Sequence, residues 1–337
     1  MGNIVLHIGT HKTATSSLQL FLHENSKALK ESGIVYPQLD ESKAHHSLLL
    51  KWFDIHSKAC GRQTKSANQL WAEVVNLCNT TSDTVVVSSE EFSRIGLNQC
   101  DPAEIRELLH GHNVRIVVYL RRQDLFLESC YNQIRKARLN APEFKEFIEN
   151  DFAGFYLEHL PLDYHTLIDR WSSAFGTQSM IVKIFDKSLF VNESIYEDFL
   201  SILSDDRSLC KNLIKRSSSI GVNESYPPAV LDAYSRLKPR GAFVRAKRGL
   251  KKKLNKLITC RKGSFMSPSQ RERILELSRT SNNEVARKYL GANVSDLAQE
   301  DMLFKVNGVF PPEFKPVSER QLFFIKYRLI RFRKYFS

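Results

Sequence analysis

The chain has 337 residues, enough for one large α/β domain or a domain with an appendage, and its 42% hydrophobic and 26% charged content is ordinary for a soluble globular protein. No run approaches the roughly 18 apolar residues of a membrane span, and no basic and apolar leader precedes Ile4, so we expect neither a spanning helix nor a signal peptide. The six cysteines are scattered without a C-x-x-C pair, which favours reduced thiols in a cytoplasmic protein and argues against a zinc site.

The net charge of +12 is concentrated in one part of the chain. Residues 207–262 carry 16 Lys or Arg residues against the two acids Glu224 and Asp232, a net charge of +14. The remainder is therefore close to neutral, and only the basic stretch needs an explanation. Such a stretch raises the local concentration of an anionic partner.

The first expected element is a buried strand over residues 4–8, a short apolar run with β-branched residues that ends at Gly9. A helix follows, because residues of the N-cap type precede an apolar helical run from Leu18 to Leu22. A strand, a tight turn and a helix aim backbone N–H groups and a positive helix end at one place, and this turn contains Lys12. The sequence therefore predicts an anion site here. The N-cap candidates are Thr13, Thr15, Ser16 and Ser17.

This turn, H-I-G-T-H-K-T-A-T-S-S-L-Q, is similar to the 5′-phosphosulfate loop of sulfotransferases, which commonly reads K-T-G-T-T. The resemblance implies a P-loop-type fold and the donor 3′-phosphoadenosine 5′-phosphosulfate (PAPS). Ala14 stands where the family often has glycine, a change that does little harm unless the position needs a positive φ angle. The loop residues that the resemblance assigns to donor binding are Gly9, Thr10, His11, Lys12, Thr13, Ala14, Thr15 and Ser16.

Further strand patterns occur at residues 33–37, 84–89, 113–120 and 180–185, with helical patterns between them. This alternation predicts an α/β fold, a parallel sheet with helices on both faces. In such sheets ligands bind beyond the carboxyl ends of the strands. Lys12, the pair Glu90 and Glu91, and the pair Arg121 and Arg122 follow three of these strands, so we expect them to converge.

The segment from Arg121 to Gln133 is similar to the 3′-phosphate segment of sulfotransferases, R-D-P-x-x-R-x-x-S-x-Y. Arg121 matches its arginine, Ser129 its serine and Tyr131 its tyrosine, while Phe126 replaces the inner arginine, a departure that resembles a bacterial branch of the family. Arg121 offers a planar fork suited to a phosphate, and Ser129 can add a hydroxyl donor. The alternative is that Arg121 forms an ion pair with Asp124 or Glu128.

Three side chains are candidates for the base that takes the proton of an acceptor hydroxyl. Glu90 is the first, because it follows a strand at the place where several Golgi-type sulfotransferases carry a catalytic glutamate, and a raised pKa would suit it to the task. Glu91 is adjacent, so only one of the two carboxylates can point into the site. His46, with His45 beside it, is the rival, because cytosolic sulfotransferases use histidine. Lys12 is expected to stabilise the charge on the leaving oxygen, and the scheme requires no metal.

Beyond residue 215 the strand signal fades. Helical patterns occur at residues 230–237, 268–278 and 282–290, while residues 238–262 suit a loop or a mobile basic helix. The stretch from Gln321 to Phe336 mixes aromatic residues with five basic residues and no acid. We therefore expect a sulfotransferase core over residues 1–215 and a mainly helical, basic C-terminal extension over residues 216–337 that packs on the core.

The leading hypothesis is a PAPS-dependent sulfotransferase that acts on a hydroxyl of a carbohydrate, glycolipid or polysaccharide, an acceptor that rests on the resemblance alone. The tail 321–337 would suit the anionic inner face of the membrane, which allows a cytoplasmic protein in peripheral contact with it. The alternative is an ATP-dependent P-loop kinase, although Lys12 lies too early for a Walker loop. A nucleic-acid-binding protein is a third hypothesis, but the sequence carries no recognised RNA or DNA module.

Overall fold

The structure is a computed structural model, and it describes residues 2–55, 64–96, 99–137, 143–147, 161–206, 212–213, 226–237, 244–258, 263–291, 303–304, 310–311, 313 and 315–330. The chain forms two compact units. The first unit comprises residues 1–122, 154–223 and 278–305, and the second comprises residues 123–153, 224–277 and 306–337. The expected division at residue 215 stays a prediction.

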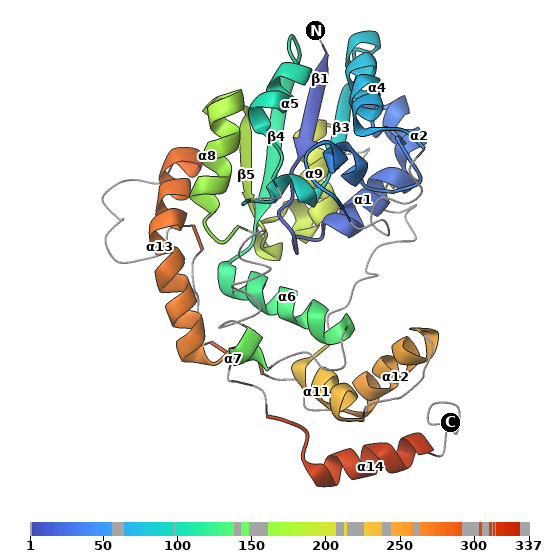
Figure 1. Cartoon of the computed structure of the whole chain (residues 1–337), viewed down its shortest axis with the longest axis vertical. Helices are drawn as coiled ribbons and strands as arrows, with labels where there is room; N and C mark the ends of the chain where they lie inside the picture. The colour runs from blue at the N-terminus through green and yellow to red at the C-terminus, as the bar shows by residue number, and fades with distance from the viewer. Residues whose placement is uncertain are drawn as a thin grey trace. The chain divides into compact units, whose positions relative to one another are not determined.

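The first unit is built on a five-stranded parallel sheet in the order β2-β3-β1-β4-β5, drawn in Figure 1. The central strand β1 pairs with β3 on one side and with β4 on the other, so the strand that leads into the predicted anion loop is the most enclosed. The α/β fold expected from the alternating patterns is thereby confirmed. The strands are β1 (Asn3–His7), β2 (Ile34–Val35), β3 (Thr84–Ser88), β4 (Asn113–Leu120) and β5 (Met180–Ile184).

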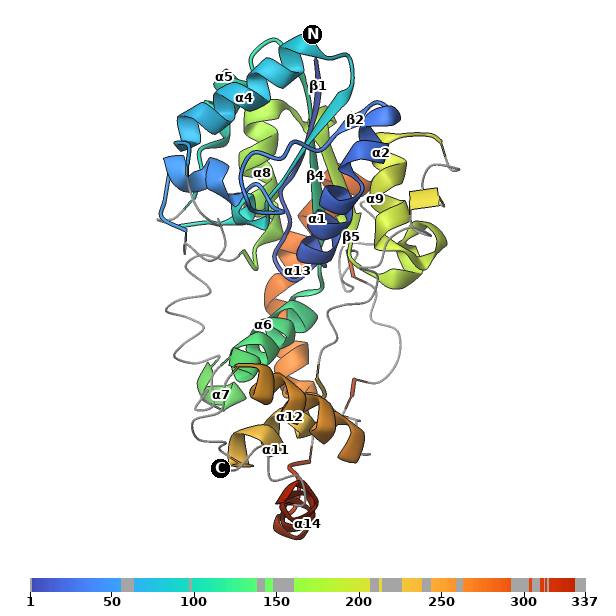
Figure 2. The same cartoon turned by 90° about the vertical axis from the view of Figure 1, so that its right-hand side faces the viewer.

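Alternate residues of these strands enter two different hydrophobic clusters, because successive side chains of a strand point to opposite faces. Leu6 and Val87 pack with helices α4, α5 and α8 on one face, and Val5 and Val86 pack with α1, α2 and α9 on the other. Both faces of the sheet are therefore buried, as Figures 1 and 2 show. The helices are α1 (Thr15–Glu24), α2 (Ser26–Glu31), α4 (Ala67–Thr80), α5 (Pro102–Leu108), α8 (Tyr164–Phe175) and α9 (Ile195–Leu203).

The second unit is helical in the part of it that the structure describes. Helices α11 and α12 share a hydrophobic cluster with Val317 and with Ile325 of α14. Residues 244–257, for which the sequence left a loop or a helix open, form the regular helix α12. The helices are α6 (Gln123–Ala137), α7 (Phe144–Glu146), α11 (Pro228–Leu237), α12 (Val244–Leu257) and α14 (Glu319–Ile330).

Two helical patterns expected in the C-terminal part are confirmed, and they join into one helix. The patterns at 268–278 and 282–290 belong to a single helix, α13 (Pro268–Leu290), which runs through the polar residues between them. Asn282 is fully buried there, and the Ser281 hydroxyl donates to the Asp163 carboxylate at 2.6 Å. Tertiary contacts thus hold as a helix a polar run that, read alone, suggests a break.

A few short helical turns complete the description, and two of them hold predicted site residues. The turn η1 (His46–Lys51) begins at His46, and the turn η2 (Glu90–Ser93) begins at Glu90. The other turns are η4 (Thr177–Ser179), η5 (Lys187–Leu189) and η6 (Val191–Glu193). In the described residues, none of the helices has both the length and the apolar character needed to cross a membrane.

Candidate functional site

The loop between β1 and α1 turns through three residues in the left-handed region. Gly9 has φ 101°, Lys12 has φ 64° and Ala14 has φ 60°. A Cβ atom on Gly9 would also lie 3.0 Å from the Cα atom of Glu90, so only glycine lets the strand end approach β3 this closely. The loop and the end of β3 are therefore packed directly against each other.

Ala14 is the N-cap of α1, and its backbone lies at φ 60° and ψ 20° without a side-chain cap. The expectation that one of the hydroxyl residues caps the helix is therefore wrong. Thr13 instead donates its hydroxyl to the Thr10 carbonyl at 2.6 Å, which closes the loop on itself. The position does need a positive φ angle, the condition under which alanine in place of glycine carries a cost.

The end of the loop is positioned to present N–H groups to a ligand. Helix α1 begins at Thr15, and the first turn of any α-helix has N–H groups without an i−4 carbonyl partner, which here include those of Thr15 and Ser16. The Thr10 amide and hydroxyl both donate to the Tyr119 carbonyl, at 3.0 and 3.1 Å, and so fix the loop to the end of β4. This arrangement suits an anion, as the sequence predicted for this turn.

Arg121 reaches directly into this loop. Its Nη1 donates to the Lys12 carbonyl at 2.8 Å, although 109 residues separate the two in the chain. The Arg121 carbonyl accepts a hydrogen bond from the Tyr164 hydroxyl, and its guanidinium lies 5.6 Å from the centre of the Phe185 ring. Arg121, the first residue of the second motif, is therefore brought to the first motif at the carboxyl ends of β1 and β4.

The two carboxylates considered as alternative partners of Arg121 belong to the second unit. Asp124 and Glu128, on α6, both form ion pairs with Arg271, whose side chain is 1% exposed. Ser129 lies on the same helix, in the second unit, and its role in donor binding stays a prediction. Both acidic residues of the second motif, Asp124 and Glu128, therefore belong to an ion-pair cluster with Arg271.

Glu90 is held beside the loop by Gln19. The Gln19 amide on α1 donates to the Glu90 carboxylate at 2.8 Å. Burial raises the pKa of Glu90, but attraction to His46 and His11 and the hydrogen bond from Gln19 outweigh it, so the pKa lies below its usual value. The raised pKa considered from the sequence is not found, and the side chain is an ionised carboxylate at neutral pH.

Glu91 points to a different set of partners. Its carboxylate forms an ion pair with Arg94, and the His11 Nε2 atom lies 4.0 Å away from it. Burial lowers the pKa of His11, which attraction to Glu91 and Glu90 offsets only in part. Neighbouring Glu90 and Glu91 thus diverge as expected. The predicted role of His11 in donor binding is untested, and its ring lies toward these carboxylates.

His45 and His46 differ sharply although they are adjacent. The His45 Nε2 donates to the Pro37 carbonyl at 2.7 Å and its Nδ1 accepts from the Ser88 amide at 3.0 Å, so both ring nitrogens are engaged by the backbone. Burial lowers the pKa of His45 to about 4. His46 uses Nδ1 to contact the Ser89 hydroxyl at 2.7 Å, which leaves Nε2 for another partner. Of the two, only His46 can serve as a base.

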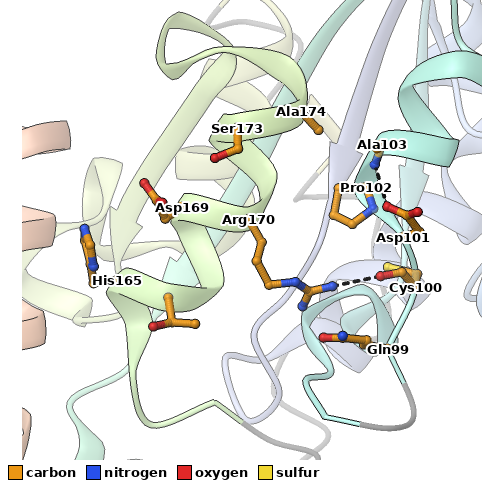
Figure 3. A pocket seen from close by; sticks show the side chains of 11 residues that line it. Gln99, Cys100, Asp101, Pro102, Ala103, His165, Asp169, Arg170, Ser173 and Ala174 are labelled. Atoms are coloured by element: carbon orange, nitrogen blue, oxygen red, sulfur yellow. Dashed lines mark hydrogen bonds between the residues drawn. The ribbon is translucent and has the colours of Figure 1, made fainter.

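A separate cavity of about 730 Å³ opens between α8 and the start of α5, as Figure 3 shows. None of the predicted site residues lines it. Arg170 from α8 donates to the Arg94 carbonyl at 3.3 Å and to the Cys100 carbonyl at 2.8 Å, so one wall is fixed to the loop that follows Glu91. Its polar lining side chains are Gln99, Asp101, His165, Thr166, Asp169, Arg170 and Ser173.

Sequence reasoning missed three residues that hold this site together. Gln19 anchors Glu90, Arg94 pairs with Glu91, and His7 contacts the Ser88 hydroxyl at 2.8 Å. Gln19 lies one helical turn after Thr15, so it shares the face of α1 that begins at the loop, a spacing visible in the sequence. No comparable signal marks His7, the last residue of β1.

The comparisons with known proteins include a similarity in sequence and a similarity in structure. No family model matches the chain. A protein from Archaeoglobus fulgidus, described as uncharacterized, is 29% identical over 228 residues, which are 65% of this chain and 58% of that protein. The chain thus aligns with little more than half the length of that relative.

The second similarity is to a crystal structure of a sulfotransferase from Alicyclobacillus acidocaldarius. It covers 89% of this chain and 99% of that chain with 12% sequence identity, and the TM-score is 0.47. Similarity at this level does not assign a function.

Proposed function

We propose that the protein is a sulfotransferase that moves a sulfuryl group from PAPS to a hydroxyl of a carbohydrate acceptor. One observation carries the proposal: Arg121 Nη1 donates to the Lys12 carbonyl at 2.8 Å. The contact joins the segment that resembles a 5′-phosphosulfate loop to the segment that resembles a 3′-phosphate site. A single bisphosphorylated nucleotide can then contact both.

In the proposed reaction the acceptor oxygen attacks sulfur and forms the new S–O bond, while the bond from sulfur to the bridging phosphate oxygen breaks. The electron pair of that bond stays on the 5′-phosphate, where the Lys12 ammonium and the N–H groups of the α1 first turn stabilise the developing charge. Glu90 takes the proton of the acceptor hydroxyl. As in phosphoryl transfer, positioning and electrostatics do most of the work.

The low pKa of Glu90 does not disqualify it as the base. The carboxylate is ionised before the donor arrives, which is the state that accepts a proton. Binding of an anionic donor nearby raises the pKa of a carboxylate, because like charges favour its protonated form. The basicity of Glu90 therefore increases when the nucleotide is bound. His46 stays the rival, since its Nε2 is oriented away from the Ser89 contact.

A carbohydrate acceptor is supported by the polar cavity beside η2. Its walls carry amide, carboxylate, imidazole, guanidinium and hydroxyl groups, which suit the many hydroxyls of a sugar. Arg170 fixes one wall to the carbonyl of Arg94, and Arg94 pairs with Glu91, next in sequence to Glu90. A glycan bound there can extend toward the proposed base.

The test measures binding of the product 3′-phosphoadenosine 5′-phosphate and of adenosine 5′-phosphate by calorimetry, in the wild type and in Arg121→Ala. Losing charge-assisted hydrogen bonds to the 3′-phosphate is expected to weaken binding of the bisphosphate by about 10- to 100-fold and to affect the monophosphate far less. Lys30→Ala, which removes one exposed positive charge from α2, is the matched control.

Two results contradict the proposal. One is preferential binding of ATP with Mg²⁺ over the bisphosphate, which favours the kinase alternative. The other is an Arg121→Ala protein that binds both adenosine phosphates as tightly as the wild type, which separates the two motifs. The acceptor is then sought by screening glycans for release of 3′-phosphoadenosine 5′-phosphate from PAPS.

A further inference from the structure

Helix α14 exposes two consecutive phenylalanines. Phe323 is 67% exposed and Phe324 is 54% exposed, and their ring centroids lie 6.1 Å apart. Single apolar residues on a surface are common and need no explanation. Two adjacent phenyl rings on one side of one helix form a local apolar patch, and such patches mark interaction sites.

The opposite side of α14 packs against α11 and α12 of the same unit. Ile325 is buried in the cluster that also contains Val230 of α11 and Leu254 of α12, and Leu322 packs against the same cluster. At 100° per residue, Leu322 and Ile325 share one side of the helix, and Phe323 and Phe324 fall on the side directly opposite. The helix therefore turns Leu322 and Ile325 toward the cluster and exposes Phe323 and Phe324 on its outer side.

Polar contacts fix the start of α14 to α11, so the two phenylalanines have a defined position on the second unit. Arg236 of α11 donates to the Val317 carbonyl and forms an ion pair with Glu319, the first residue of α14. The Val317 amide donates to Asp232 at 3.3 Å. The polar contacts at the start of α14 and the apolar packing of Leu322 and Ile325 together hold the helix against α11 and α12.

The same unit is strongly basic. Helix α12, V-R-A-K-R-G-L-K-K-K-L-N-K-L, contains seven Lys or Arg residues and no acid. Leu250 and Leu254 are buried, whereas Lys252 and Lys256 are exposed on the other side of the helix. The sequence from Gln321 to Phe336 adds five further basic residues without an acid. An exposed aromatic pair and a cationic helix thus occur on one three-helix cluster of α11, α12 and α14.

We infer that this three-helix cluster docks on an anionic lipid bilayer, with Phe323 and Phe324 inserted at the headgroup boundary and basic side chains over the anionic headgroups. Aromatic residues on one face of a helix and lysines nearby are the combination that binds such interfaces. The inference goes beyond the transfer reaction and does not depend on it. It places the protein where lipid-linked carbohydrates are accessible.

A single-stranded nucleic acid also binds lysines and aromatic rings, but it uses rings that offer their faces for stacking. The planes of Phe323 and Phe324 meet at 76°, edge to face, so the two rings do not form a parallel stacking platform. Insertion into an acyl boundary needs apolar surface and no ring alignment. The geometry therefore favours the lipid surface.

The test is flotation of the full chain with vesicles of phosphatidylcholine alone and with vesicles of phosphatidylcholine and phosphatidylglycerol in about equal parts. The wild type is expected to float with the anionic vesicles and to be released as salt rises to about 0.5 M, because salt screens the headgroup attraction. Combining Phe323→Ser with Phe324→Ser is expected to weaken vesicle binding by roughly 100-fold, since both rings leave the apolar boundary.

Matched controls separate the patch from general effects. Leu189→Ser with Val191→Ser removes two exposed apolar side chains from the first unit and should leave flotation unchanged. Lys252→Gln with Lys256→Gln should weaken binding to anionic vesicles by about 10-fold or more, whereas Lys27→Gln with Lys30→Gln on α2 should not. Thermal melting of each variant verifies that folding is intact.

Several outcomes would overturn the inference. Equal flotation with both vesicle types would show that the anionic headgroups do not contribute to binding. Unchanged flotation of the variant that combines Phe323→Ser with Phe324→Ser would show that the two phenylalanines do not contribute. Binding to a single-stranded oligonucleotide that depends on the phenylalanines, without vesicle binding, assigns the surface to nucleic acid. A dimer in sedimentation that the same change dissociates, again without vesicle binding, assigns it to a second copy of the chain.

Discussion

Two clusters of charged side chains lie in different units of this protein, and their partners differ in kind. In the second unit the Arg271 guanidinium faces Asp124, which is fully buried, and Glu128, which is largely buried. In the first unit the half-buried Glu90 carboxylate faces a neutral amide from Gln19 and the imidazoles of His46 and His11. The Arg271 cluster pairs a guanidinium with two carboxylates, whereas the Glu90 carboxylate accepts a hydrogen bond from a neutral amide.

We interpret this difference as one between a structural cluster and the cluster proposed to take part in the reaction. The Arg271 cluster joins α6 to the start of α13 through two ion pairs, which is a structural role. Under the function that we propose, Glu90 takes a proton from the acceptor hydroxyl, and its hydrogen bond from the neutral Gln19 amide leaves it able to do so. The Arg271 cluster has no part in that proposal.

The largest expected effect comes from Arg271→Met. Removing the cation leaves the buried Asp124 carboxylate without its ion pair, which should lower the free energy of unfolding by about 3–5 kcal/mol. Urea denaturation followed by circular dichroism measures the change. Combining Arg271→Met with Asp124→Leu and Glu128→Gln should recover much of the loss, because apolar packing replaces the charges.

Arg287→Met is the control for this prediction. Arg287 pairs with Glu284 on the surface of α13, where the two side chains are 46% and 37% exposed. Exposed pairs contribute little, so the cost should stay below about 1 kcal/mol. Equal losses for Arg271→Met and Arg287→Met would show that burial of the Arg271 cluster carries no special weight.

The substitution Glu90→Gln tests the proposed role of Glu90 as the base. The amide keeps the shape and can still accept from Gln19, but it cannot take a proton, so turnover should fall on the order of 1,000-fold. Binding of 3′-phosphoadenosine 5′-phosphate should be nearly unchanged. The assay is release of that nucleotide from PAPS with a glycan that the enzyme accepts.

The matched variants for this assay are Glu91→Gln and His46→Gln. Glu91 is paired with Arg94, so its loss should act through loop position and cost much less turnover. If Glu90→Gln keeps near-normal turnover and His46→Gln loses it, the histidine is the base. Losses of equal size in all three variants would point to a shared structural role.

Histidines give the first unit its own pH response. His7 and His45 are buried and their pKa is lowered to about 4, whereas an unfolded chain binds these protons near pH 6.5. The unfolded state therefore holds more protons between these values, and stability falls as the pH falls from about 6.5 to 4. The free energy of unfolding should drop by roughly 3 kcal/mol per histidine over that window.

Urea titrations at several pH values measure this slope, and His45→Gln should reduce it by about one proton. His110→Gln changes an exposed histidine and is the control. An unchanged slope in His45→Gln would mean that His45 does not account for the acid sensitivity.

The sheet and the approach of the two motifs were accessible from sequence because the signals are local. Apolar strands followed by Lys12, Glu90 and Arg121 place these residues at one edge of a parallel sheet, and the topology confirms the sheet. The Gln19 contact with Glu90 and the two backbone bonds of His45 were not accessible, since they join residues 71 and up to 43 positions apart. The continuous helix α13 was also missed, because burial of Asn282 is a tertiary effect.

The smallest expected effect concerns the loop itself, through Ala14→Gly. Ala14 lies at φ 60°, where an L-residue is disfavoured by about 1–2 kcal/mol, and glycine recovers this while losing up to about 1 kcal/mol through a freer unfolded chain. The net gain in unfolding free energy should lie between about 0 and 2 kcal/mol. Ala72→Gly, at an exposed interior position of α4, should instead cost about 1 kcal/mol, because no strain is relieved there. Opposite signs for the two alanines support the strained loop, and a loss at both positions argues that the surrounding contacts, rather than the residue type, determine its backbone.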